Sequence, residues 1–263
     1  MKLTVLGKYS PFPPAGGAGP GYWVQFDEGV QRGQGGEGAQ GPQGVLLDCG
    51  PGVLSRFQET VGPLSLIRRV ILSHLHFDHT SDFHSLRYAA SPARQYRDLP
   101  QHITVYAPAL PEKEASLLAY RECVDAKVVE PGTSIELGQG GEAVSITFFS
   151  GEHPIPCHAM RIEGPRGVIA YSGDSRPCDS LVEAARGADL FLCEASAIEE
   201  DAAFAAAGHL TAKQAGEVAK RAGVKRLLLT HLWPLYDENV LLEECRRVFP
   251  AAEIAKERAT YTL

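Results

Sequence analysis

The sequence predicts a layered α/β domain with mixed β-sheets, and three observations lead to this fold class. The chain has 263 residues, 44% of them hydrophobic and 22% charged, which is ordinary for a globular protein and ample for a sizeable core. Short apolar runs recur between turn residues, and in the second half they alternate with helical patterns. There is no internal repeat and no break in composition between positions 50 and 263, so we expect one domain over residues 1–263.

Ten runs of four to six residues, rich in apolar and β-branched side chains, are typical of β-strands because Gly, Pro or Asp flanks them. In chain order they are Leu3–Leu6, Gly21–Phe26, Gly44–Leu47, Arg69–Leu72, Ile103–Tyr106, Val144–Phe149, Ala159–Ile162, Gly167–Tyr171, Leu190–Cys193 and Arg226–Leu229. The earlier elements are mostly strands and the later ones mix strand with helix, which favours mixed sheets.

Five further segments have the pattern of helices. Two of them have clear end signals: one has Thr211 as its N-cap and Gly223 just past its end, and another stops before Pro250. The five are Val53–Thr60, Lys113–Arg121, Asp179–Arg186, Thr211–Ala222 and Glu238–Val248.

The segment Gln31–Gln43 reads QRGQGGEGAQGPQ and lies between two predicted strands. Gly and Gln at this density supply no core side chains, so we expect a flexible hairpin extension there.

Charge and composition exclude several classes of protein. With 25 Lys and Arg against 32 Asp and Glu the net charge is −7, which excludes a protein that coats nucleic acid by charge alone. No apolar run approaches the roughly 18 residues of a membrane span, and the N-terminal apolar run is too short for a secretory leader. We therefore expect a cytoplasmic protein without a membrane partner, whose six dispersed cysteines stay reduced.

The chemistry of the chain is concentrated in residues 69–79, which read RVILSHLHFDH. An apolar strand runs into His74, His76, Asp78 and His79, and alternation places the first two on one side of the extended chain. Imidazole and carboxylate suit Zn²⁺ or a similar divalent ion, and so many of them would be costly to bury without a cation. The chain then turns into a helix, on which His84 falls.

Three further candidate ligands each follow the end of a predicted strand. They are His153 in SGEHP, Asp174 in SGDS and His231 in THL. Strand ends at one edge of a sheet are where such sites are built, so we expect these three side chains to join the first cluster.

With these residues the chain resembles the metallo-β-lactamase superfamily, whose hallmark is H-x-H-x-D-H with a later His, Asp and His. LLDCG at 46–50 resembles the early Asp motif, in which Asp48 would support the metal loop rather than bind metal. The resemblance covers nearly the whole chain and implies a four-layer αβ/βα sandwich of two mixed β-sheets, with a dimetal site at one edge. It implies one metal on His74, His76 and His153, another on Asp78, His79 and His231, and Asp174 bridging both.

The second half is similar to ribonuclease Z. SGDSRPC at 172–178 resembles its S-G-D-T-R-P-C stretch, CEAS at 193–196 its H-E-A-T box, and GHLTA at 208–212 its G-H-S-T-A box. The resemblance implies that Glu194 and His209 pair beside the metals and that His209 protonates the leaving oxygen. With Asp78, these two are the predicted catalytic residues. A role for His209 as a helix N-cap is the alternative, but Thr211 is the better cap by type.

One departure from ribonuclease Z argues against tRNA. That family inserts a long tRNA-gripping arm between the third-motif His and the bridging Asp, whereas His153 and Asp174 are only 174 − 153 = 21 residues apart. The chain more closely resembles arm-less relatives, such as the uncharacterised YhfI-like hydrolases and the small cyclic-phosphate phosphodiesterases. We therefore expect a small or single-stranded phosphodiester, attacked by metal-held hydroxide, as substrate.

Three other functions stay open at this point. The same ligands would serve a lactone or other acyl hydrolase, and tRNA 3′ processing of the ribonuclease Z type is the second alternative enzyme. A catalytically silent metal-binding module is the alternative outside enzymes. The expected cofactor is two Zn²⁺, with Mn²⁺ and Fe²⁺ open because these ligands do not separate them. The resemblance and the frequency of two-fold dimers predict a homodimer.

Overall fold

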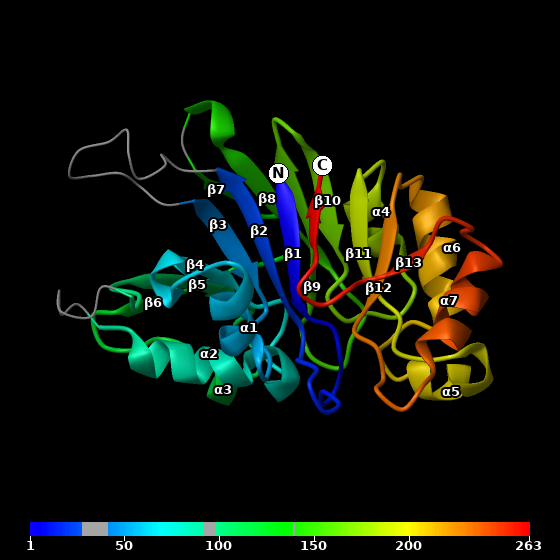
Figure 1. Ribbon diagram of the computed structural model, residues 1–263, viewed down its shortest axis with the longest axis horizontal. Helices are drawn as coiled ribbons and strands as arrows, with labels where there is room; N and C mark the ends of the chain where they lie inside the picture. Colours follow the sequence, from blue (N-terminus) through cyan, green and yellow to red (C-terminus); the bar gives the residue numbers. More distant parts are fainter. Residues whose placement is uncertain (28–41, 92–97, 139) are drawn as a thin grey trace.

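The computed structural model describes residues 1–27, 42–91, 98–138 and 140–263. Residues 31–41 of the expected hairpin extension lie outside these ranges, while Gln43, at its end, already begins a strand. Within the described residues the strands form two sheets of seven (Figure 1).

The first sheet has the strand order β14-β1-β2-β3-β4-β5-β6. Its β14, β1, β2 and β3 pair antiparallel, whereas β3, β4, β5 and β6 pair parallel. The strands are β1 (Lys2–Gly7), β2 (Gly21–Asp27), β3 (Gln43–Leu47), β4 (Arg69–Ile71), β5 (Ile103–Ala107), β6 (Val124–Val128) and β14 (Thr260–Thr262).

The second sheet repeats this plan with the order β13-β12-β11-β10-β9-β8-β7. Its β7 to β10 pair antiparallel and its β10 to β13 pair parallel. The strands are β7 (Ser134–Leu137), β8 (Val144–Ser150), β9 (His158–Gly164), β10 (Gly167–Tyr171), β11 (Leu190–Glu194), β12 (Leu227–Thr230) and β13 (Glu253–Ile254). Both sheets are therefore mixed, as the sequence predicts.

Three layers of buried side chains hold the four layers of secondary structure together. Between the sheets, residues such as Leu47 of β3 and Phe148 of β8 belong to one core cluster. A second cluster joins the outer face of the first sheet to α1 and α2, and a third joins the outer face of the second sheet to α4, α6 and α7. Each large apolar side chain that is fully buried contributes about 1.5–3 kcal/mol. The result is the αβ/βα sandwich that the resemblance implied (Figure 1).

Four of the five predicted helices begin and end within two residues of the expected bounds, whereas α5 was not predicted. They are α1 (Val53–Thr60), α2 (Phe77–Ala89), α3 (Glu112–Ser116), α4 (Asp179–Ala185), α5 (Ala202–Ala205), α6 (Ala212–Ala222) and α7 (Glu238–Arg246). Thr211 caps α6 in a reciprocal capping box with Gln214, and Gly223 ends that helix in the left-handed conformation. None of the helices in these described ranges is long and apolar enough to cross a membrane.

The predicted helix Lys113–Arg121 is wrong in its extent, because α3 ends at Ser116. Beyond it Tyr120 pairs with Val124 as an isolated bridge, and Arg121 has a positive φ of 48°. The chain thus reverses to enter β6, and the pairing at the sheet edge overrides the helical preference of the segment.

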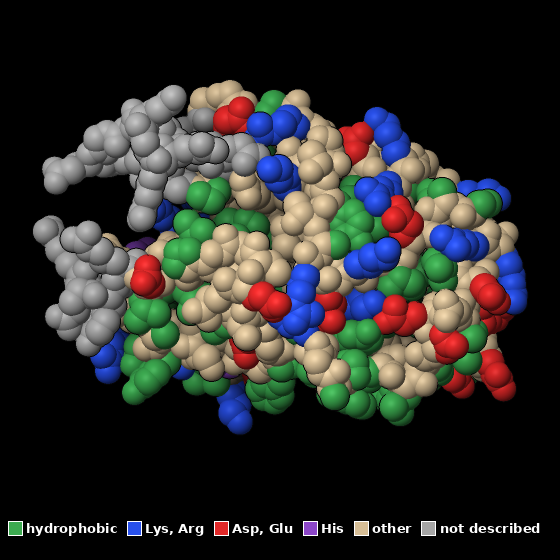
Figure 2. Space-filling model, viewed as in Figure 1, with side chains coloured by type: hydrophobic (Ala, Val, Ile, Leu, Met, Phe, Trp, Pro, Cys, Tyr) green, Lys and Arg blue, Asp and Glu red, His purple; other side chains and the backbone are tan. Residues whose placement is uncertain are grey.

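The surface mixes charges of both signs. On the face shown in Figure 2, Lys and Arg side chains stand among Asp and Glu side chains rather than in one broad basic patch. This agrees with the net charge of −7.

Candidate metal centre

The candidate ligands meet where strands of both sheets end. The segment from His74 to His79 follows β4 and runs into α2, whereas His153, Asp174 and His231 follow β8, β10 and β12 of the second sheet. Asp48, after β3, and Glu194, the last residue of β11, lie at the same edge. All seven ligands that the sequence predicts are brought together here.

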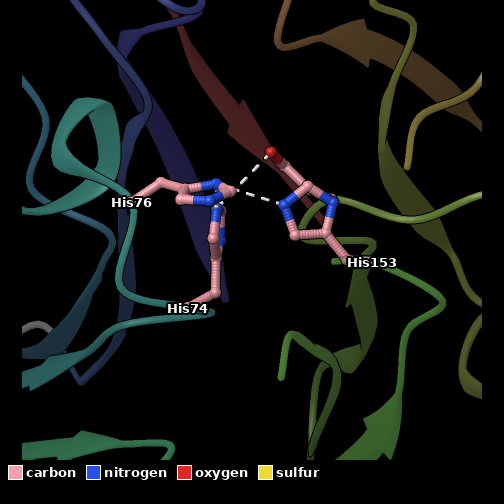
Figure 3. A group of neighbouring side chains, drawn as sticks. His74, His76 and His153 are labelled. Atoms are coloured by element: carbon pink, nitrogen blue, oxygen red, sulfur yellow. Dashed lines mark hydrogen bonds and ion pairs between the residues drawn. The ribbon is translucent and has the colours of Figure 1, made fainter. Parts of the chain in front are cut away.

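The outer group consists of His74, His76 and His153, whose rings converge from opposite sides of the centre (Figure 3). Nδ1 of His76 lies 3.0 Å from Nε2 of His74 and 3.1 Å from Nε2 of His153. His74 is fully buried, while the other two are partly exposed.

The inner group consists of Asp78, His79 and His231. The two imidazoles face each other with their Nε2 atoms 3.0 Å apart, and each Nε2 lies 3.7 Å from Oδ2 of Asp78. Only the carboxylate of Asp78 is partly exposed, at 13%. This group is therefore more deeply enclosed than the outer one.

Asp174 lies between the two groups and is 2% exposed. Its Oδ2 is 3.6 Å from Nε2 of His74 in the outer group and 3.1 Å from Nε2 of His231 in the inner group. Its Oδ1 is 3.5 Å from Nε2 of His79 and has no hydrogen-bond partner among the described residues. A buried carboxylate oxygen without a partner is costly, which suits a bridging metal ligand.

Hydrogen bonds behind the rings fix where the imidazole protons lie. Nδ1 of His79 is 2.8 Å from a carboxylate oxygen of Asp48, and Nδ1 of His153 is 2.9 Å from the carbonyl oxygen of Gly208. Both oxygens only accept, so each Nδ1 carries the proton and each Nε2 presents a lone pair to the centre.

The same conclusion holds for the other two rings that point Nε2 inward. Ser73 donates its only hydroxyl proton to Asp48, and so accepts from Nδ1 of His74 at 3.1 Å. Ser196 donates to Glu194 at 2.7 Å, and so accepts from Nδ1 of His231 at 2.8 Å.

Lone pairs that face each other at about 3 Å repel, and a cation between them relieves the repulsion. The spacing fits one, because ligand atoms of a tetrahedral Zn²⁺ site with bonds of about 2.0–2.1 Å lie about 3.3 Å apart. In the ion pairs between described residues, the carboxylates of Asp48, Asp78, Asp174 and Glu194 meet histidine only. The donor set thus fits divalent metal ions in both groups.

The pKa shifts differ between the groups. Burial lowers the pKa of His74, His76 and His153, which keeps these rings neutral. Burial also disfavours charge on His79 and His231, but the carboxylates around them outweigh it, Asp174 first. The pKa of His79 is raised well above its ordinary value, and that of His231 rises to about 10. In the metal-free chain, protons on the inner group therefore offset the negative charge that metal ions would offset.

Asp48 supports the metal loop from behind. It accepts from the backbone N–H and hydroxyl of Ser73 at 2.7 and 2.9 Å, from the hydroxyl of Tyr171 at 2.6 Å, and from His79. Its φ of 53° is unusual for a residue other than Gly, as is the 55° of His231. The packing therefore holds both residues in conformations that they would rarely adopt alone.

Close approach of the backbone explains two glycines at the site. A Cβ on Gly50 would lie 2.0 Å from the carbonyl oxygen of Asp78, and one on Gly208 would lie 2.8 Å from Nδ1 of His153. Any side chain at either position would push a candidate ligand out of place.

Glu194 and His209 form a pair beside the inner group. Nδ1 of His209 is 3.3 Å from Oε1 of Glu194 and 3.8 Å from Oδ2 of Asp174. Glu194 is fully buried and accepts from the backbone N–H groups of Ser175 and Leu210. Burial alone lowers the pKa of His209, but the Glu194 carboxylate outweighs it, so this pKa lies above its ordinary value. His209, Asp174 and His231 are also close enough to share a metal, so His209 is a proton donor or a ligand by geometry.

A cavity of about 180 Å³ opens next to this pair. Its lining residues are Ser10, Pro11, Ser196, Phe204, His209, His231 and Trp233. His209 and His231 line the cavity and also lie next to Asp174, so the cavity adjoins the candidate metal centre.

The sequence did not point to three supporting residues. Ser73 precedes the first ligand and was visible in the motif, but its hydroxyl has no recognisable signal. Tyr171 reaches Asp48 across 123 residues, and Ser10 donates to Oδ2 of Asp78 at 2.7 Å across 68 residues. Such long-range contacts of common residue types leave no pattern in a single sequence.

Comparison with known proteins places these features in a family. Residues 43–232 match a family model described as a beta-lactamase superfamily domain. The chain is 31% identical to the probable metallo-hydrolase YhfI of Bacillus subtilis over 95% of this chain and 94% of that protein. The crystal structure of YhfI superposes with a TM-score of 0.81 over 99% of this chain and 98% of that one.

Two further relatives carry names that refer to RNA. Ribonuclease BN of Escherichia coli O1:K1 / APEC is 26% identical over 83% of this chain and 88% of its own length. The short form of human tRNase Z superposes with a TM-score of 0.71 at 20% identity, over 100% of this chain and 99% of that chain, which shows a shared fold.

Proposed function

The chain belongs to the metallo-β-lactamase superfamily of metal-dependent hydrolases, and from this premise we propose that it is a dinuclear phosphodiesterase for small or single-stranded phosphodiesters. Two divalent ions, Zn²⁺ in the first place, would supply an activated water and offset negative charge on the phosphoryl oxygens. The outer group would hold one ion, the inner group the other, and Asp174 both.

The observation that carries the proposal is the pair of Glu194 and His209 beside the ligand cluster. Hydrolysis of a phosphodiester needs a proton for the departing alkoxide. Glu194, fixed by backbone N–H groups, lies 3.3 Å from Nδ1 of His209 and attracts the ring by charge, although Nδ1 makes no aligned hydrogen bond with it. In the proposal, Nε2 of His209 is the nitrogen that gives up a proton to the leaving oxygen. The names of ribonuclease BN and tRNase Z support a phosphodiester as the substrate.

The segment between the outer group and Asp174 favours a substrate smaller than tRNA. The hairpin of β9 and β10 fills most of the interval between His153 and Asp174, and its strands pair from Gly164 and Gly167 at the turn. A net charge of −7, and mixed charges on the face shown in Figure 2, offer little attraction for a large polyanion.

The test measures bound metal and then turnover of chromogenic phosphodiesters, lactones and thioesters. We expect two divalent ions per chain and turnover of bis(p-nitrophenyl) phosphate. His209→Ala should lower the rate by about 10²–10⁴-fold while metal content stays near normal. His102→Ala is the matched control, because His102 is half exposed and pairs with Asp125 on the surface.

Other outcomes would select another function. Turnover of lactones without turnover of phosphodiesters would establish the acyl hydrolase instead. A metal-loaded protein that processes nothing on the panel would favour the silent module. Loss of metal in His209→Ala would make His209 a ligand rather than a proton donor.

A further inference from the structure

The cavity beside His209 and His231 has a size that suits one ring of a ligand. At about 180 Å³ it is smaller than the roughly 300–1,000 Å³ of pockets that enclose a whole drug-sized molecule. Because both histidines also belong to the candidate metal centre, a group in the cavity would be a close neighbour of the reacting phosphate.

The walls of the cavity are aromatic. The indole of Trp233 packs edge-to-face with Phe204, with ring centroids 5.3 Å apart and an interplanar angle of 76°. Phe12 packs on Trp233 from 6.3 Å at 69°. Edge-to-face packing is favourable and fixes the plane of the indole ring. Phe204 is nevertheless 48% exposed, so apolar ring surface remains available for a flat partner.

The two serine side chains of the cavity already donate hydrogen bonds to carboxylates of the metal centre. Ser10 donates its hydroxyl proton to Asp78, and Ser196 donates its own to Glu194. Among the described residues that line it there is no Lys, Arg, Asn or Gln that could read the edge of a base by paired hydrogen bonds. The cavity therefore selects for a flat ring and not for the identity of the ring.

From these observations we propose that the cavity is a subsite for a nucleobase, held by stacking on Phe204 and Trp233. The substrate class is then a nucleoside phosphodiester whose base and scissile phosphate belong to the same nucleotide. Because stacking tolerates every base, purines and pyrimidines are both accepted. This inference rests on the proposed phosphodiesterase function, since it names the substrate class of the same site.

The first experiment compares two diesters that share a leaving group. We expect kcat/KM for thymidine 5′-(p-nitrophenyl) phosphate to exceed that for methyl p-nitrophenyl phosphate by about tenfold or more. In Phe204→Ala and Trp233→Leu this ratio should fall below about threefold, because kcat/KM for the nucleoside diester falls more than that for the methyl diester. Tyr88→Ala is the matched control, because Tyr88 is an exposed aromatic of α2 outside the cavity lining.

The second experiment measures binding without turnover. The chain has two tryptophans, of which Trp23 is buried at 1% exposure and Trp233 lines the cavity. Uridine and adenosine 5′-monophosphates should quench tryptophan fluorescence with affinities within about threefold of each other, since stacking is tolerant of the base. Ribose 5-phosphate should not quench it, and Trp233→Phe should remove the signal.

The two experiments separate the two proposals. Hydrolysis of both diesters with equal efficiency would overturn the nucleobase subsite and leave the phosphodiesterase function standing. Nucleotide-specific quenching without turnover of either diester would support the subsite and overturn the function. Equal binding of ribose 5-phosphate, or quenching that persists unchanged in Trp233→Phe, would overturn the subsite.

Discussion

The outer and inner groups of the centre are built from similar side chains but are held differently. In the outer group, Nδ1 of His74 donates to a hydroxyl and Nδ1 of His153 donates to a backbone carbonyl, and two of the three rings are partly exposed. In the inner group, Nδ1 of His79 donates to the carboxylate of Asp48, and Asp78 is itself a carboxylate. The inner group is thus more buried and more negatively charged.

This difference predicts unequal affinity for metal. Each group shares Asp174, but only the inner group adds a carboxylate ligand of its own and a carboxylate behind a ligand. A carboxylate that accepts from a ligating imidazole raises the basicity of the ligand. We therefore expect the inner group to retain its ion longer than the outer group.

The largest effect is expected from Asp174→Ala, because the Asp174 carboxylate lies within ion-pair distance of histidines in both groups. Its loss removes the bridge, so turnover of bis(p-nitrophenyl) phosphate should fall more than about 10³-fold. Metal content, measured by mass spectrometry of the ions, should drop below one per chain. Near-normal metal content with turnover within about tenfold of the parent would show that the groups bind independently of Asp174.

Asp48→Ala should damage the inner group more than the outer group, because Asp48 accepts directly from His79 and reaches His74 only through the hydroxyl of Ser73. The substitution leaves a backbone N–H, two hydroxyls and the imidazole of His79 without their buried acceptor. We expect the unfolding free energy to fall by about 3–5 kcal/mol, and the affinity for one of two ions to fall about 10–100-fold. Urea unfolding and metal titration measure the two quantities.

Tyr171→Phe is the control for Asp48→Ala, because it removes only one of these hydrogen bonds. It should cost about 1 kcal/mol of unfolding free energy and leave both ions bound. Equal loss of both ions in Asp48→Ala would contradict a larger role of Asp48 in the inner group.

The fold was largely predictable because its central strands are apolar on one or both faces. All ten predicted strands are present, whereas β6, β7, β13 and β14 were missed. These four are the edges of the two sheets. An edge strand has a partner on one side only and buries little, as the pattern of β6 shows, with four of its five residues exposed. Hydrophobic periodicity therefore carries no signal there.

The site was predictable to the extent that its chemistry is local. The ligands could be found because each follows an apolar strand, and strand ends of one sheet edge meet in space. The partners that hold them could not, since Ser10 and Tyr171 act across the whole fold through ordinary hydroxyls. The unequal exposure of the outer and inner groups and these long-range partners became visible only in three dimensions.

Stepwise chelation tests the ranking of the two groups directly. With a limiting chelator, one ion should leave about tenfold faster than the other, because the outer group is partly exposed and less charged. His76→Ala should lack the fast phase and still bind one ion, whereas Asp78→Ala should lack the slow phase. Metal release followed with a chromogenic chelator gives both rates. A fast phase that survives in His76→Ala would reverse the ranking.

Ser10→Ala should give the smallest effect and the sharpest test of the inner group. Ser10 donates to Oδ2 of Asp78 at 2.7 Å, and this carboxylate is 13% exposed, so water can replace the hydroxyl. We expect the unfolding free energy to fall by only about 1 kcal/mol. Because Ser10 orients a ligand, the ion that is released more slowly should nevertheless bind about tenfold more weakly. The affinity for the ion that is released faster should not change. Ser134→Ala, which removes a hydroxyl pair with Thr147 on an exposed sheet edge, should change neither ion. If Ser10→Ala weakens the faster ion instead, then Asp78 serves the outer group, and the division of ligands proposed above must be redrawn.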